Sequence, residues 1–173
     1  MSHPKTISLE KVLATNVNDQ SWVEKYRPKN ITDIFYQNDT IKSINGLINF
    51  GNIPHFLFFG PPGTGKTSTI KSIVTELQQK NKIDSILELN ASNERGINVV
   101  RVKIKNFAQH STQHGKIKFI ILDEADTMTS DAQTALRRCM ELYSNTRFCL
   151  ICNYVSRMID PIISRCVIYR FKP

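Results

Sequence analysis

Residues 55–69 read His-Phe-Leu-Phe-Phe-Gly-Pro-Pro-Gly-Thr-Gly-Lys-Thr-Ser-Thr, and they carry the clearest indication of the fold. Its first five residues are a short apolar run typical of a buried strand, and the glycines and prolines that follow predict a tight turn. Apolar residues then recur at helical spacing across residues 70–77, so we expect a helix after the turn. A strand, a glycine-rich turn and a helix in this order predict an α/β unit.

Strand-like and helix-like segments continue to alternate along the rest of the chain. Several apolar runs lack a two-residue period, which indicates strands buried on both faces and is typical of parallel sheets. We therefore predict an α/β fold with a mostly parallel, five-stranded sheet sandwiched between helices. The other strands are expected at 85–89, 116–122, 147–152 and 166–171, and the other helices at 41–48, 99–110 and 130–143. Ligands of such sheets bind at the carboxyl ends of the strands.

The turn after the first strand matches the phosphate-binding pattern GxxxxGK[ST] in full. Glycines in this pattern let backbone N–H groups approach phosphate oxygens, and the helix that follows presents its positive N-terminus. We expect Lys66 to reach the β- and γ-phosphates of a nucleotide and the Thr67 hydroxyl to bind Mg²⁺. The alternative is a glycine-rich surface turn without a ligand. The residues predicted to bind nucleotide here are Gly60, Pro61, Pro62, Gly63, Thr64, Gly65, Lys66, Thr67 and Ser68.

Acidic residues follow the apolar run of residues 119–122, at the sheet edge that the phosphate loop occupies. In nucleoside triphosphatases an Asp at this place holds Mg²⁺ through water, and a following Glu orients the attacking water. These roles are predicted for Asp123 and Glu124. For Asp126 two interpretations stay open, a part in the same site or a cap or tether of the following helix. The letters Asp-Glu-Ala-Asp also occur in a class of helicases, whose phosphate loop normally begins with Ala.

The composition indicates one globular domain, and its basic balance fits either a polyanionic partner or a protein that binds nothing charged. The chain has 173 residues, 40% of them hydrophobic and 22% charged, and its apolar runs are far shorter than a bilayer span. The net charge is +8 and the pI is about 9.4, an excess that favours binding to a polyanion. The N-terminal residues contain no apolar signal segment, so we expect an intracellular, reducing location in which the four cysteines stay reduced.

Eight segments in a fixed order resemble the AAA+ ATPases and, within them, the small subunits of replication factor C, the eukaryotic-type sliding-clamp loader. Together they cover the chain from about residue 21 to residue 173. The segments are WVEKYRP (22–28), GPPGTGKTST (60–69), LELNASNERGI (87–97), VRVKIKNFAQ (100–109), ILDEAD (121–126), AQTALRRCMELYS (132–144), TRFCLICNY (146–154) and SRC (164–166).

The resemblance implies an ATP- and Mg²⁺-dependent subunit of a nuclear hetero-pentamer that loads a ring-shaped sliding clamp onto primer–template DNA. It divides the chain into a partly flexible N-terminal segment, residues 1–20, and an ATPase core, residues 21–173. The chain ends at Pro173, before the helical lid and the collar of the family, so we expect little ATPase activity from the isolated chain. Two alternatives stay open: another AAA+ DNA motor, of the branch-migration type, and a nucleotide-binding structural subunit without turnover.

Four further site residues are predicted by resemblance. Asn153 corresponds to sensor 1, the side chain that contacts the γ-phosphate and helps to fix the attacking water; its alternative is a strand-end cap. Val23 and Arg27 correspond to residues on the adenine and phosphate side of the nucleotide. Arg165 corresponds to the arginine finger, which would reach the γ-phosphate held by a neighbouring subunit. The alternative for Arg165 is a surface salt bridge.

Basic residues without any acidic neighbour occupy residues 95–122. Arg101 and Lys105 are four apart on a predicted helix and share a face, which suits the backbone of a DNA strand. By resemblance, Arg95 also contacts DNA and couples that contact to Glu124. The family usually has Asp where this chain has Asn93, so a carboxylate that could pair with Arg95 is missing. A solvated basic face is the alternative.

Two other patterns have simpler interpretations. Cys149 and Cys152 form a CxxC pattern, but residues three apart on a strand point to opposite faces, so we predict packing and not a zinc site. His110 and His114 are expected in a loop and not as metal ligands.

The helix expected at 130–143 carries the pattern RRxxE. Arg137 and Glu141 lie at i,i+4 spacing, which fits either contacts between subunits, with Gln133 coupled to the DNA surface, or an ordinary pair on an exposed helix.

Overall fold

Five parallel strands form one sheet in the order β2-β3-β4-β1-β5. The computed structural model describes residues 38–93 and 97–173, with the backbone alone for 38 and 97–100. The strands are β1 (His55–Phe59), β2 (Ile83–Asn90), β3 (Ile117–Asp123), β4 (Thr146–Cys152) and β5 (Cys166–Arg170). The α-helices are α3 (Asn38–Asn49), α4 (Lys66–Gln79), α5 (Ile97–Gln109), α6 (Ser130–Leu142) and α7 (Asp160–Ile163), and short 3₁₀ turns are η2 (Ala125–Thr127) and η3 (Val155–Arg157).

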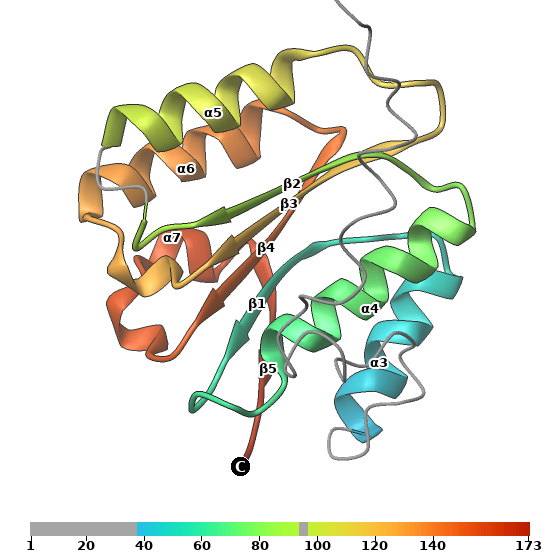
Figure 1. The fold of residues 1–173 in the computed structure, drawn as a ribbon, viewed down its shortest axis with the longest axis horizontal. Helices are drawn as coiled ribbons and strands as arrows, with labels where there is room; N and C mark the ends of the chain where they lie inside the picture. Colours follow the sequence, from blue (N-terminus) through green and yellow to red (C-terminus); the bar gives the residue numbers. More distant parts are fainter. Residues whose placement is uncertain (1–37, 94–96) are drawn as a thin grey trace, which may run out of the picture.

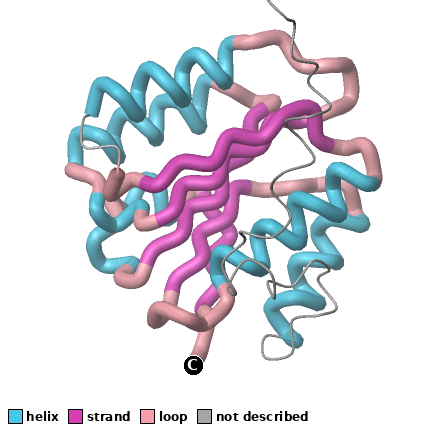
Figure 2. The backbone as a smooth tube through the Cα atoms, in the orientation of Figure 1, coloured by secondary structure: helices cyan, strands magenta, loops and turns pink. Residues whose placement is uncertain are grey.

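Helices cover both faces of this sheet. In Figure 1, α3 and α4 lie on one side of the strands, and α5 and α6 lie side by side on the other. Figure 2 shows the twisted strands as one layer between them. The prediction of a five-stranded parallel sheet sandwiched between helices is therefore confirmed.

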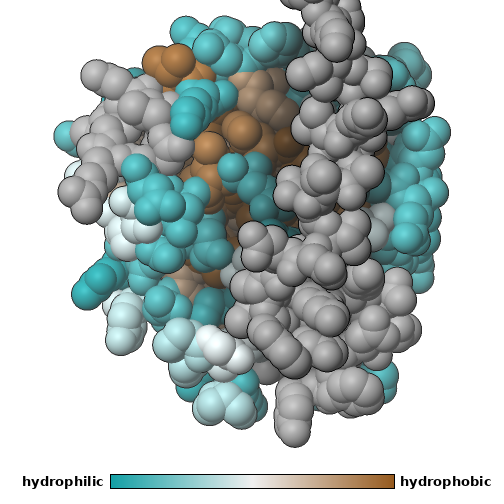
Figure 3. All heavy atoms as spheres, viewed as in Figure 1, coloured by the Kyte–Doolittle hydropathy of each residue, from teal (hydrophilic) through white to brown (hydrophobic). Residues whose placement is uncertain are grey.

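Alternate residues of each strand supply the two halves of the core. In β1, Phe56 and Phe58 pack in the cluster that includes α3 and α4, whereas Leu57 packs in the cluster of α5 and α6. Strand side chains alternate between faces, so a continuous apolar run such as 55–59 is what a strand covered on both sides requires. Figure 3 shows brown, hydrophobic side chains gathered between the teal, hydrophilic ones in the middle of one face.

The two cysteines of the CxxC pattern lie on opposite faces of β4, as predicted. Cys149 packs in the core on the α3 and α4 side, and Cys152 packs on the α5 and α6 side. Burial raises the pKa of the Cys152 thiol to about 12, which disfavours the thiolate that a metal requires. Among the described residues, no group of three or more His, Cys, Asp or Glu side chains could hold a metal ion. His110 and His114 lie in a loop, as expected for the pair, because α5 ends at Gln109, one residue before the predicted helix end.

Strand boundaries lie within two residues of the predicted ones, whereas helix α3 begins at Asn38, three residues before the predicted start. Strand β2 runs from Ile83 to Asn90 and is longer than the predicted 85–89, because both of its ends also pair with β3, Ile83 opposite Ile117 and Asn90 opposite Asp123. Helix α3 ends just before Gly51, whose φ of 76° suits the expected helix stop.

None of the helices in the described part of the chain combines the length and the hydropathy needed to cross a bilayer.

Candidate active site

The predicted phosphate loop and the acidic strand end meet at one edge of the sheet because of the strand order. The loop follows β1, the acidic residues end β3, and β4 lies between these two strands. Their carboxyl ends surround a pocket of about 410 Å³. Its lining residues are Pro62, Gly63, Thr64, Gly65, Lys66, Thr67, Ser68, Asp123, Glu124, Ile151, Cys152 and Asn153. Among the predicted nucleotide ligands, only Gly60 and Pro61 of the described loop are not in this lining.

The first glycine of the loop has a packing role as well as the predicted one. Gly60 has φ 149°, and a Cβ atom there would lie 2.2 Å from the carbonyl oxygen of Phe171. The chain comes this close because the Phe171 N–H donates to the Phe59 carbonyl oxygen at 2.8 Å. Gly60 is thus needed where the end of β5 passes the start of the loop. Gly65, at φ 88°, precedes the first residue of α4.

Lys66 ties the loop to the end of β4. Its Nζ donates to the carbonyl oxygens of Gly60 at 2.7 Å and Pro61 at 2.8 Å, and to Asn153 Oδ1 at 3.1 Å. Lys66 is buried, and this desolvation lowers the pKa of its ammonium group, although the nearby Asp123 carboxylate opposes the shift. A buried cation that points into a pocket at a helix N-terminus is a suitable partner for a phosphate group.

Thr67 and Asp123 lie side by side in the pocket. The Thr67 hydroxyl donates to Asp123 Oδ2 at 2.9 Å, and Asp123 Oδ1 accepts the Glu124 N–H at 2.8 Å. A hydroxyl and a carboxylate are the oxygen ligands that Mg²⁺ prefers, and Mg²⁺ sites of this type are completed by phosphate oxygens and water. The two side chains therefore fit the predicted Mg²⁺, with its remaining ligands supplied from outside the protein.

Glu124 is held in an unusual backbone conformation. Its φ is 52°, one of two positive values among the described non-glycine residues. Its Oε1 accepts a hydrogen bond from Asn90 Nδ2 at 3.3 Å. Left-handed backbone in a residue other than glycine is concentrated at functional sites. The sequence reasoning missed Asn90; its polar side chain at the end of the strand next to β3 is the signal that could have revealed it.

The contacts of Asp126 distinguish between its two interpretations, a part in the site and a cap or tether of the following helix. It is buried, and its Oδ2 accepts the backbone N–H groups of Asn153 and Tyr154, both at 3.2 Å. The cap of the following helix is instead Thr129, whose side chain accepts the Ala132 N–H. Asp126 is therefore a tether, but it fixes the segment that carries Asn153 and not the helix that follows it.

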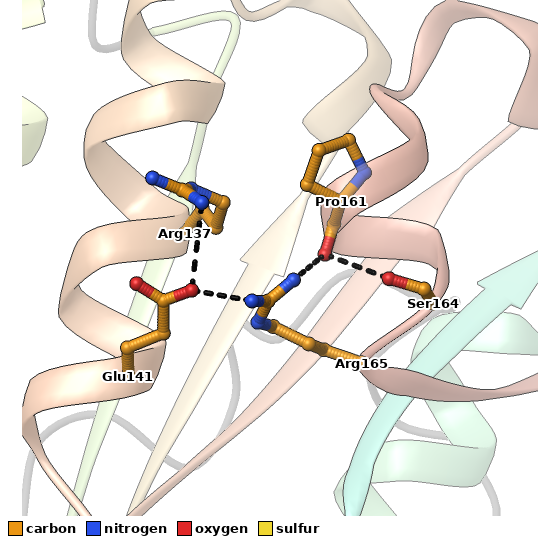
Figure 4. Close-up of polar contacts among 5 residues, drawn as sticks. All are labelled: Arg137, Glu141, Pro161, Ser164 and Arg165. Carbon is orange, nitrogen blue, oxygen red and sulfur yellow. Dashed lines mark hydrogen bonds and ion pairs between the residues drawn. The ribbon is translucent and has the colours of Figure 1, made fainter.

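Arg165 lies away from this pocket, at the amino ends of the strands. It precedes Cys166, which pairs with His55 at the start of β1, whereas the phosphate loop follows the end of β1. The five residues of that strand span about 16 Å. Figure 4 shows Arg165 bound to Glu141 and to the Pro161 carbonyl oxygen. The structure thus separates Arg165 from the other predicted catalytic residues.

The predicted DNA-binding residues are only partly described. Arg101 and Lys105 are exposed on α5, and both charges lower the pKa of the Cys139 thiol of α6, although burial, the larger effect, raises it. The helix that carries both residues packs beside α6, on the face of the sheet away from α3 and α4. Val23, Arg27 and Arg95 lie outside the described residues.

Residues 56–173 match the family described as "ATPase family associated with various cellular activities (AAA)". The chain belongs to the AAA family. In this AAA chain, the matched segment contains the phosphate loop, Asp123, Asn153 and Arg165, that is, the pocket together with the residue at the amino ends of the strands.

Relatives of this AAA chain include subunits of replication factor C. Replication factor C subunit 2 of Saccharomyces cerevisiae is 54% identical over 166 residues, which cover 88% of this chain and 47% of that protein. The replication factor C small subunit of Archaeoglobus fulgidus is 53% identical over 158 residues, covering 90% of this chain and 50% of that protein. These matches confirm the predicted resemblance, and the chain spans about half the length of both proteins.

Solved structures with a similar fold include a RuvB variant of Thermotoga maritima. It superposes with a TM-score of 0.64 at 20% identity, over 85% of this AAA chain and 48% of that chain. At this level of identity the likeness concerns the fold alone.

Proposed function

We propose that this AAA chain is an ATP-binding and ATP-hydrolysing subunit of a clamp loader that places a sliding clamp on primer–template DNA. The observation that carries the proposal is the contact of Lys66 with Asn153 across a pocket that also holds the Thr67–Asp123 pair. About half of the residues are identical to those of replication factor C subunits over the matched length, which favours this function over that of a branch-migration motor.

Each pocket residue has a distinct role in this proposal. Lys66 exchanges its contacts with loop carbonyls for the β- and γ-phosphates of ATP, and backbone N–H groups of residues 60–68 surround the phosphate oxygens. Thr67 would hold Mg²⁺ directly and Asp123 would hold it through a water molecule, and the bound ion would neutralise charge on the phosphate oxygens. Glu124 orients the attacking water, and Asn153 contacts the γ-phosphate.

The remaining predicted residues act outside the described pocket or in other subunits. Arg165, about a strand length from its own phosphate loop, acts on ATP held by a neighbouring subunit of a hetero-pentamer. Arg101 and Lys105, with Arg95, contact the DNA backbone, and Val23 and Arg27 contact the nucleotide. Location in the nucleus follows from the same proposal.

The test is assembly followed by ATP binding. Expressed with the other subunits of a clamp loader, this protein should enter the complex and load a clamp onto primed DNA. Lys66→Ala should abolish ATP binding at this subunit. The matched control is Lys80→Ala, which removes an exposed lysine paired with Glu76 at the far end of α4 and should change neither binding nor loading. Failure to enter the complex would contradict the proposal, as would ATP binding that survives Lys66→Ala.

The isolated chain should show little ATPase activity, because the residue that completes each site comes from a neighbour. Turnover by the purified monomer at the rate of the complex would contradict action in trans.

A further inference from the structure

Three charged side chains meet at the amino ends of the strands, opposite the end of the sheet that carries the phosphate loop. Glu141, near the end of α6, has its Oε1 2.5 Å from the Arg165 guanidinium and 3.6 Å from that of Arg137 (Figure 4). Arg137 is on the same helix, one turn earlier, whereas Arg165 comes from the segment between α7 and β5. One carboxylate thus serves two guanidinium groups, and the cluster keeps a net positive charge.

Arg165 is held at two points. Its second contact is an Nη1 donation to the Pro161 carbonyl oxygen at 2.7 Å, and the Ser164 hydroxyl donates to the same oxygen at 3.2 Å. The guanidinium group is planar and rigid, so two hydrogen bonds to fixed acceptors set the direction of the whole group. The side chain remains 36% exposed, so the group is oriented and still accessible to a molecule outside the domain.

Orientation matters because an arginine that stabilises charge in a transition state acts only in the correct place. A displacement of about 1 Å at a reacting centre can cost roughly a hundredfold in rate. A long, unrestrained arginine would sample many rotamers at the surface. The contact with Glu141 restricts the rotamers of Arg165. Glu141 is itself fixed, because its helix packs on the core through Leu136 and Met140.

We propose that Glu141 is a positioning residue for Arg165, which it holds directed toward the γ-phosphate on a neighbouring subunit. This inference rests on the proposed function, in which Arg165 acts in trans. The RRxxE pattern by itself indicated either contacts between subunits or an ordinary pair on an exposed helix, and the positioning of Arg165 is a different role for its glutamate. The competing interpretation, a surface ion pair that affects neither rate nor affinity, is an outcome of the test.

The experiment uses the reconstituted complex that contains this protein, with four variants: Arg165→Ala, Glu141→Ala, Glu141→Gln and the double Glu141→Ala/Arg165→Ala. The part of the ATPase turnover that Arg165→Ala removes is the Arg165-dependent turnover. Glu141→Ala should lower this part about tenfold with an unchanged KM for ATP. Glu141→Gln should retain most of it, because the amide oxygen can still accept the hydrogen bond from Arg165.

The double variant separates action through Arg165 from an independent effect. It should equal Arg165→Ala alone, because Glu141 has nothing to position once the guanidinium is gone. The control is Glu76→Ala, which breaks another i,i+4 pair, with Lys80 on α4, and should leave turnover and KM unchanged. All variants should unfold at the same temperature as the wild type, since exposed ion pairs contribute little stability.

The possible results test the action of Arg165 and the positioning role of Glu141 separately. Unchanged turnover in Arg165→Ala removes the finger itself and, with it, this inference. If Arg165→Ala lowers turnover but Glu141→Ala does not, action in trans stands and the positioning role is wrong. A raised KM, a lower unfolding temperature in Glu141→Ala, or additive losses in the double variant would likewise overturn the positioning role.

Discussion

Lys66 Nζ lies 3.1 Å from Asn153 Oδ1, so the first residue of α4 and the residue after β4 are joined across the carboxyl edge of the sheet. Asn153 is fixed from the other side by Asp126, which accepts its backbone N–H. The amide is therefore held at a defined place in the pocket before any nucleotide is present. Such preorganised groups are the main source of rate enhancement in many enzymes.

Asn153→Ala should reduce ATP turnover in the assembled complex by roughly 10- to 100-fold, because one preorganised polar group at the γ-phosphate is lost. ATP affinity should change little, since Lys66 and the loop remain. Measurement of kcat and of equilibrium ATP binding tests whether turnover falls while ATP affinity is retained. Asn52→Ala, in an exposed loop before β1, is the control, and a loss of affinity without a loss of kcat would argue against the assigned role.

Gly60→Ala should destabilise the fold by about 2–4 kcal/mol, because the new Cβ would lie 2.2 Å from the Phe171 carbonyl oxygen in a left-handed backbone region. Chemical denaturation monitored by circular dichroism measures the change. Gly46→Ala is the matched control in α3, where nothing lies within 4 Å of the added atom. This second variant should stabilise the protein by about 0.5–1 kcal/mol. Equal stability of the two variants would show that the close approach to Phe171 is wrong.

Asp126→Ala should cost about 2–4 kcal/mol of unfolding free energy, because the backbone N–H groups of Asn153 and Tyr154 lose their shared acceptor. Turnover should fall as well, since the segment that carries Asn153 is released. Asp126→Asn keeps an acceptor oxygen and should lose less than Asp126→Ala in both measurements. Wild-type stability in the alanine variant would contradict the tether.

Stability should fall as the pH is lowered from about 6.5 to about 4. Burial, aided by the positive charge of Arg147, lowers the pKa of His55 from 6.5 to about 4. The folded protein therefore keeps His55 neutral, with Nδ1 accepting the Phe148 N–H at 3.2 Å, while the unfolded chain binds a proton below pH 6.5. Because the unfolded state binds more protons in this window, the free energy of unfolding rises with pH across it.

Denaturation of the wild type and of His55→Gln at several pH values isolates this contribution. The glutamine variant does not titrate, so its stability should vary less between pH 4 and 6.5 than that of the wild type. Identical pH profiles for the two proteins would show that His55 is not the group responsible.

Local sequence was sufficient for the phosphate loop and for the strands. A run such as 55–59 can only be buried on both faces, and the glycine pattern that follows restricts the backbone to a few conformations. The edges of β2 were less predictable, because Asn90 belongs to the strand through its pairing with β3 and not through an apolar side chain.

An α/β domain with a phosphate loop, an acidic strand end and apolar strands follows from residue type and short-range spacing alone. The individual contacts between these parts depend on the order of the strands in the folded sheet. The strand order puts β4 between β1 and β3, which brings Asn153 to Lys66 and gives Asp126 its two backbone partners. The same order leaves Arg165 at the amino ends of the strands beside Glu141. These pairings join residues that are between 24 and 87 positions apart, and no local pattern encodes contacts over such separations.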